Sequence, residues 1–255
     1  MSEDANTPKV LVHGNPEVAA IWGPLVTQLG DRGVEGIVRL SPPGFGAPTG
    51  EGWGATRAEY VDWLRSELDE IGRPVDIVGH DWGAGHVYGL LAVAPRLVRS
   101  YATDIAGVIH PDYVWHDMAQ AWQTPDVGEQ VVGAMTAGDV AGRSAAYVEL
   151  GIPADVATAM AEATDEEMGR CILALYRDAA QPAVAELGAE LFAAELPPGL
   201  ILAPTEDAYV PHAQSVEVAD RLGARLAELP GQGHWWMLED AAPAADALVR
   251  FWHSL

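Results

Sequence analysis

The chain has 255 residues, 49% of them hydrophobic, which is enough to bury the core of one large domain or two small ones. Its 14 basic and 37 acidic residues give a formal net charge of −23, which disfavours binding to nucleic acid and to anionic membranes. No apolar run reaches the roughly 18 residues that a membrane span requires. The single cysteine, Cys171, cannot form an internal disulfide, and the start Met1-Ser2-Glu3-Asp4 lacks a signal-peptide pattern, so we expect a cytoplasmic protein.

The first part of the chain alternates short apolar runs with helical segments. The runs end at turn-forming residues and predict buried strands at Lys9–His13, Gly36–Leu40, Pro74–Gly79 and Val98–Ile105. Helices are predicted between them at Glu17–Leu29, Thr56–Ile71 and Gly83–Ala94. The second helix has the clearest start, because Thr56 and Glu59 form a capping box.

From about Gly107 to Leu196 the pattern changes to helical segments without a convincing strand, including Glu166–Ala180 and Pro182–Ala194. Alternation then resumes with strands at Leu200–Ala203 and Ala224–Leu229 and helices at His212–Leu222 and Ala241–Trp252. Strands alternating with helices predict an α/β protein with a doubly wound, mostly parallel sheet. We therefore divide the chain into a core, residues 1–107 and 197–255, and an inserted helical lid, residues 108–196.

The segment Gly79-His80-Asp81-Trp82-Gly83 joins a predicted strand to a predicted helix. Small residues two positions before and after Asp81 are typical of a nucleophile elbow, a tight turn that presents its central side chain above the sheet. An alternative interpretation is that Asp81 only caps the following helix. Asp207 and His234 follow later strands, at the sheet edge where ligands bind in such folds.

The order Asp81, Asp207, His234 is that of nucleophile, acid and base in an α/β-hydrolase triad, with aspartate in place of serine. The sequence thus resembles the α/β-hydrolase fold family and, within it, the haloalkane dehalogenases and epoxide hydrolases. The motif His13-Gly14-Asn15-Pro16 is similar to the H-G-x-P of this family. The resemblance covers nearly the whole chain, although the lid matches weakly and the usual leading hairpin is missing, so we expect a shortened amino terminus and a smaller sheet.

The resemblance implies that Asp81 attacks carbon to form an alkyl ester, which water activated by His234 hydrolyses while Asp207 orients the histidine. It also implies that backbone N–H groups of Asn15 and Trp82 bind the oxyanion. In a dehalogenase, the side chains of the same two residues would bind the departing halide, because a halide leaves with a full charge that needs hydrogen-bond donors.

Asp104, which follows the fourth predicted strand, is an alternative acid, because some dehalogenases take their acid from that loop. The implied reaction requires no cofactor. The eight histidines show no metal-ligand spacing, so we expect no metal site.

An epoxide hydrolase needs a proton donor for the ring oxygen, usually a lid tyrosine. The segment Leu175-Tyr176-Arg177-Asp178 resembles the lid segment that delivers one such tyrosine. Met118 stands where a second is expected, and Tyr113 or Tyr147 could substitute for it.

Three functions remain open at this point. The first is cleavage of a carbon–halogen bond in a small apolar substrate, the second is opening of an epoxide to a diol, and the third is binding of a small apolar ligand without catalysis. Four tryptophans could line an apolar pocket or fill the core: Trp115, Trp122, Trp235 and Trp236. The expected partners are the substrate and water, and a homodimer is left open.

Overall fold

The computed structural model describes residues 7–255, so the start Met1-Ser2-Glu3-Asp4, on which the cytoplasmic prediction partly depends, lies outside it. The described chain forms a parallel six-stranded sheet in the order β2-β1-β3-β4-β5-β6. The strands are β1 (Lys9–Val12), β2 (Ile37–Leu40), β3 (Val75–Gly79), β4 (Val98–Thr103), β5 (Gly199–Pro204) and β6 (Arg225–Leu229). The predicted doubly wound parallel sheet is confirmed.

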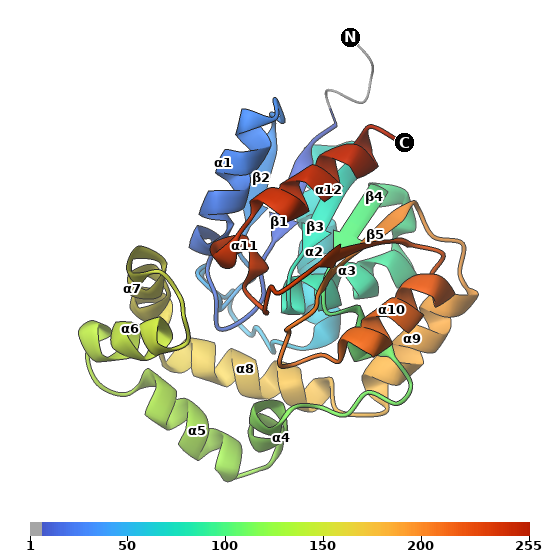
Figure 1. Ribbon diagram of the computed structural model, residues 1–255. Helices are drawn as coiled ribbons and strands as arrows, with labels where there is room; N and C mark the ends of the chain where they lie inside the picture. Colours follow the sequence, from blue (N-terminus) through green and yellow to red (C-terminus); the bar gives the residue numbers. More distant parts are fainter. Residues whose placement is uncertain (1–6) are drawn as a thin grey trace.

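Each face of the sheet has its own hydrophobic core, because successive strand residues point to opposite sides. Val10 and Ile77 pack on the face covered by α2 (Arg57–Ile71), α3 (Trp82–Val93) and α10 (His212–Arg221). Leu11 and Val78 pack on the face covered by α1 (Gly23–Asp31) and α12 (Ala242–Trp252). Figure 1 shows the sheet between these two helical layers.

The predicted start of one helix is confirmed, and that of another is wrong. The capping box of α2 is present, since the Thr56 hydroxyl accepts the Glu59 N–H and the Glu59 carboxylate accepts the Thr56 N–H. The helix predicted from Glu17 is wrong in its first turn: a 3₁₀ helix covers Ala19–Trp22, and α1 begins only at Gly23. Glu17 precedes both with its carboxylate turned into the protein, a long-range contact that hydrophobic periodicity does not report.

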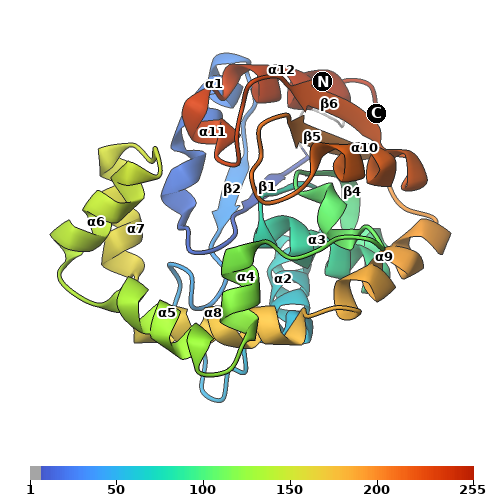
Figure 2. The same cartoon turned by 60° about the horizontal axis from the view of Figure 1, so that its bottom comes forward.

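The inserted block contains helices and no strand among the described residues: α4 (Asp117–Gln123), α5 (Val127–Thr136), α6 (Val140–Glu149), α7 (Ala154–Ala163), α8 (Glu166–Asp178) and α9 (Ala183–Ala193). In Figures 1 and 2, α4, α5 and α8 cross below the sheet, while α6 and α7 stand together at one side. None of the described helices is long and apolar enough to cross a membrane. The block therefore lies across one edge of the sheet.

Candidate active site

Asp81 occupies a strained turn between β3 and α3, with φ 49° and ψ −125°. The turn requires glycine on both sides, because a Cβ on Gly79 would lie 2.7 Å from the Ala84 backbone and one on Gly83 would lie 2.0 Å from the Val12 carbonyl oxygen. The Asp81 side chain makes no capping hydrogen bond to α3. The helix-cap interpretation is therefore wrong, and the strain presents this carboxylate to the space above the sheet.

The two carboxylate oxygens of Asp81 have different partners. Oδ1 accepts a hydrogen bond of 3.0 Å from the backbone N–H of Asn15, in the loop after β1. Oδ2 lies 3.8 Å from Nε2 of His234, in the loop after β6. This separation is longer than a hydrogen bond, so Oδ2 is available to a ligand.

His234 is held from its other side by Asp207, in the loop after β5. Its Nδ1 lies 2.9 Å from Oδ2 of Asp207. The second Asp207 oxygen accepts backbone N–H groups of Tyr209 and Val210 at 2.7 and 3.2 Å. Because Nδ1–H donates its hydrogen bond to Asp207, Nε2 is the nitrogen left free to accept a proton near Asp81.

The electrostatics fit a buried pair of acid and base. Burial raises the pKa of Asp81 from 3.8 to about 6, and the Glu17 carboxylate adds to this, while His234 opposes it. Burial lowers the pKa of His234, but the charge and hydrogen bond of Asp207 outweigh it, so the pKa of His234 is raised overall. The Asp81 carboxyl group therefore exchanges its proton closer to neutrality than a free aspartate does.

Asp104 does not contact His234. Its carboxylate instead accepts the backbone N–H of Asp81 at 3.1 Å and the indole N–H of Trp236 at 2.7 Å, and it pairs with Nδ1 of His80. The structure thus places Asp207 at the histidine and Asp104 beneath the elbow, where it anchors the Asp81 backbone. Trp236 is fully buried and fills the core.

Glu17 is a site residue that the sequence interpretation missed. Its carboxylate is 1% exposed, lies 3.0 Å from Nε2 of His80 and accepts the indole N–H of Trp235 at 2.6 Å. Burial raises the pKa of Glu17, but His80 outweighs it, and the pKa falls to about 2. Its position directly after the H-G-x-P motif was the only sequence signal for this role.

Glu17, His80 and His234 are also the one cluster among the described residues whose donor atoms, all within 4.8 Å of one another, could hold a metal ion. Both ring nitrogens of His80 already pair with carboxylates, and His234 Nδ1 pairs with Asp207. These pairings engage Glu17 and both nitrogens of His80 in a hydrogen-bond network, while Nε2 of His234 faces Asp81.

Asn15 and Trp82 both lie beside Asp81. The Asn15 side chain is 5% exposed, and its amide nitrogen and oxygen have no hydrogen-bond partner. The Trp82 side chain interacts with the Tyr176 hydroxyl, and the two rings meet edge to face. An unpartnered buried amide next to Asp81 is a ready donor for an anionic group.

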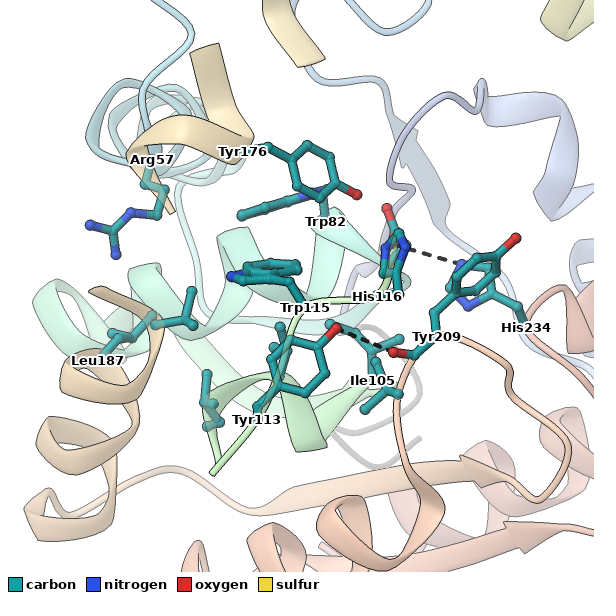
Figure 3. Close-up of a pocket in the computed structure, with 16 residues that line it drawn as sticks. Arg57, Trp82, Ile105, Tyr113, Trp115, His116, Tyr176, Leu187, Tyr209 and His234 are labelled. Atoms are coloured by element: carbon teal, nitrogen blue, oxygen red, sulfur yellow. Dashed lines mark hydrogen bonds and ion pairs between the residues drawn. The ribbon is translucent and has the colours of Figure 1, made fainter. Parts of the chain in front are cut away.

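Lid residues complete the site from above. Tyr176 of α8 is 3% exposed and, with Trp82, Tyr113 and Trp115, belongs to the aromatic wall of a cavity that reaches Asp81. Figure 3 shows Tyr176 beside Trp82, with His116 and Tyr209 on the side where His234 lies. Met118 is 46% exposed, and Tyr147 pairs with Thr164.

His116 and Tyr209 were not singled out from the sequence, and no motif marks either of them. Both line the cavity at Asp81. Burial, then His234, lowers the pKa of His116 to about 4, so the imidazole is neutral near pH 7. Its Nδ1 accepts the Ala119 N–H, and the neutral ring therefore carries its proton on Nε2.

Comparison with known proteins supports the fold. Residues 10–247 match the model of the Alpha/beta hydrolase family, and no curated protein matches. A haloalkane dehalogenase DbeA loop variant from Bradyrhizobium elkanii is 20% identical, with a TM-score of 0.74 over 98% of this chain and 91% of that one.

Other similar structures include a hydrolase and a bromoperoxidase. E-2-(acetamidomethylene)succinate hydrolase is 18% identical, with a TM-score of 0.70 over 96% of this chain and 91% of that one. A bromoperoxidase from Bacillus anthracis is 17% identical, with a TM-score of 0.71 over the same shares, 96% and 91%. These likenesses show a shared fold, and the match to the family model shows that this chain belongs to the alpha/beta hydrolase family.

Proposed function

We propose that this protein hydrolyses the carbon–halogen bond of an apolar organic halide through an ester on Asp81. One observation carries the proposal, namely the placement of the Asp81 carboxylate in an apolar cavity. Its Oδ1 accepts a hydrogen bond from the backbone N–H of Asn15, and its Oδ2 faces His234 without a hydrogen bond. A carboxylate poised in this way suits attack on an sp³ carbon. The dehalogenase among the similar structures is consistent with it.

In the first step, Oδ2 of Asp81 forms a bond to the halogen-bearing carbon as the carbon–halogen bond breaks. The halide leaves with the bonding electron pair. The unpartnered Asn15 amide N–H groups hydrogen-bond the halide, and a bond of this kind to a charge is worth about 1.5–3 kcal/mol. The water-poor surroundings of Asp81 favour the step because the carboxylate is weakly solvated.

In the second step, Nε2 of His234 takes a proton from water, and the resulting hydroxide attacks the ester carbonyl carbon. Oδ1 carries the developing negative charge and keeps its hydrogen bond from the backbone N–H of Asn15. The backbone N–H of Trp82 is the proposed second donor. Asp207 stabilises the imidazolium that forms. Collapse of the intermediate expels an alkoxide, which takes the proton from His234 to give the alcohol. The Asp81 carboxyl group then loses its remaining proton to water and regains the attacking carboxylate.

The test is to remove the base and trap the ester. His234→Gln should release about one halide per protein and then stop, with the alkyl group attached to the peptide that contains Asp81. Intact-mass and peptide mass spectrometry measure both. The double variant Asp81→Ala/His234→Gln is the matched control and should carry no adduct. A substrate that the wild type turns over while Asp81 in His234→Gln stays unmodified would overturn the mechanism.

Epoxide opening is the second candidate, and Tyr176 is the observation that favours it. The hydroxyl sits in the Asp81 cavity, and burial, with the Asp81 charge adding to it, raises the pKa of Tyr176 far above its usual range. The hydroxyl thus keeps its proton and can donate it to an alkoxide.

Paired assays separate the two candidates. Tyr176→Phe should lower diol formation at least about 100-fold if an epoxide is the substrate, because it removes the general acid. Halide release, which needs no proton donor, should stay within about threefold. The Tyr113→Phe variant is the control, since its hydroxyl donates to the Tyr209 carbonyl.

A further inference from the structure

Two cavities of very different size meet at Asp81. The smaller one, of about 40 Å³, lies beside Trp82 and Trp115, and the larger, of about 420 Å³, extends past Asn15 under the lid. The residues that line both are Asp81, His116, Tyr176, Tyr209 and His234. A substrate whose reacting carbon touches Asp81 can therefore place its remaining atoms in either cavity.

The smaller cavity has room for only a few water-sized groups, since one water needs about 10–15 Å³ measured in this way. It suits a short alkyl group at the reacting carbon, whereas Asn15, which is proposed to bind the halide, lines the larger cavity. The larger cavity falls within the range of about 300–1,000 Å³ that drug-sized ligands occupy. A substrate of only a few carbon atoms would leave most of it filled with water.

Small and apolar side chains form the far wall of the larger cavity. They come from α5, α6 and the segments that flank them: Ala134, Met135, Ala137, Gly142, Ala146 and Leu150. Several of these residues are exposed, so this wall of the cavity is accessible to solvent. Alanine and glycine at these positions leave space that larger side chains would fill.

The polar groups in this wall already have partners. Arg143 donates to the carbonyl oxygens of Thr136, Gly138 and Ala161. The Tyr147 hydroxyl pairs with Thr164. Arg57, which lines the smaller cavity, pairs with the Asp178 carboxylate. None of these cations has its hydrogen-bonding groups directed to a ligand carboxylate, and the formal net charge of −23 adds long-range repulsion.

We propose that the substrate is an uncharged organic halide with a large apolar body, on the order of ten or more carbon atoms. Its carbon–halogen bond lies at Asp81, and the body occupies the larger cavity toward the wall that α5, α6 and their flanking segments form. This inference rests on the proposed function for its reactive group, whereas the size and polarity of the body follow from the cavity alone. The lid thus selects the substrate by volume and apolar contact.

The experiment measures kcat/KM for halide release along a series from 1-bromobutane to 1-bromodecane and bromomethylnaphthalene. In the wild type we expect kcat/KM to rise at least tenfold from the smallest to the largest member. Ala146→Phe places a ring in the larger cavity and should lower the ratio of large-substrate to small-substrate kcat/KM at least tenfold. Ala145→Phe is the matched control, because Ala145 lies on the same helix and is exposed but does not line the cavity.

A second readout keeps this inference separate from the chemistry. Binding of 1-decanol and 1-butanol, measured by calorimetry, requires no turnover, and Ala146→Phe should weaken only the decanol complex, at least tenfold. A wild type that prefers bromobutane, or an Ala146→Phe variant that binds decanol as tightly as Ala145→Phe does, would overturn the substrate-size proposal. Selective decanol binding without halide release from any substrate would retain the size preference and refute the dehalogenase proposal.

Discussion

The network beneath Asp81 and the cavity above it use their polar groups in opposite ways. Below, both ring nitrogens of His80 and the carboxylates of Glu17 and Asp104 have partners. Above, the Asn15 amide and the indole nitrogens of Trp115 and Trp122 are buried without any. Satisfied groups hold the reacting atoms in place, whereas unsatisfied ones are left for a ligand. The following changes test this division.

Removal of the nucleophile should have the largest effect. Asp81→Ala eliminates the atom that attacks carbon, and we expect turnover to fall at least about 10⁴-fold, as it does when a covalent catalyst is lost. Halide release over hours measures the residual activity, and circular dichroism shows whether the variant is folded. If Asp81→Ala keeps the biological effect of the protein in full, the alternative of a non-catalytic binding protein is correct.

Substitution of Asp207 should affect ester hydrolysis, whereas substitution of Asp104 should affect mainly stability. Asp207→Asn removes the charge behind His234, so ester hydrolysis should slow about 10²–10⁴-fold while the first halide is still released in a burst. Asp104→Asn breaks the buried pair with His80 and should lower the free energy of unfolding by about 3 kcal/mol, with ester hydrolysis within tenfold of the wild type.

Rapid-quench kinetics and urea unfolding separate these two outcomes. Loss of ester hydrolysis in Asp104→Asn, with Asp207→Asn unaffected, would instead make Asp104 the acid that supports His234.

Asn15 allows its side chain and backbone to be tested separately. Asn15→Ala removes the amide proposed to bind the halide, so halide displacement should slow about 10- to 100-fold, which corresponds to about 1.5–3 kcal/mol. The backbone N–H on Oδ1 of Asp81 remains, so hydrolysis of a preformed ester should be unchanged. Equal losses in both steps would show that Asn15 acts only through the shape of its loop.

The pH dependence should be the mildest effect. The attacking form of Asp81 is the carboxylate, and its pKa is raised to about 6 by burial, so protonation removes activity as the pH falls. His234 must be neutral to act as a base, and its raised pKa acts in the same direction. We expect kcat/KM, which reports the displacement step, to be level above the acidic limb and to fall about tenfold per unit below about pH 6 as Asp81 is protonated, whereas His234 affects only the rate of ester hydrolysis. An acidic limb near pH 4 would contradict this assignment.

Much of the site could be predicted from local patterns. Asp81 was found because small residues flank a strand-to-helix junction, and Asp207 and His234 because they follow strands whose ends share one edge. Glu17 was instead assigned to a helix, since its side chain could point outward in any amphipathic segment. His116 has no local signal at all, because it reaches the cavity only through the path of the lid.

The strands, the turns and the two helical layers follow from the amino-acid sequence, because apolar spacing, glycine and capping residues act within a few positions along the chain. Which acid meets His234 could not be decided at that level. Asp207 and His234 are 27 residues apart, His80 and Glu17 are 63 apart, and Glu17 and Trp235 are 218 apart. Such pairs form only when the parallel strands bring their carboxyl ends together, and the cavity exists only once the lid packs above them. The tertiary structure therefore selects the hydrogen-bond partners and the space left for a substrate.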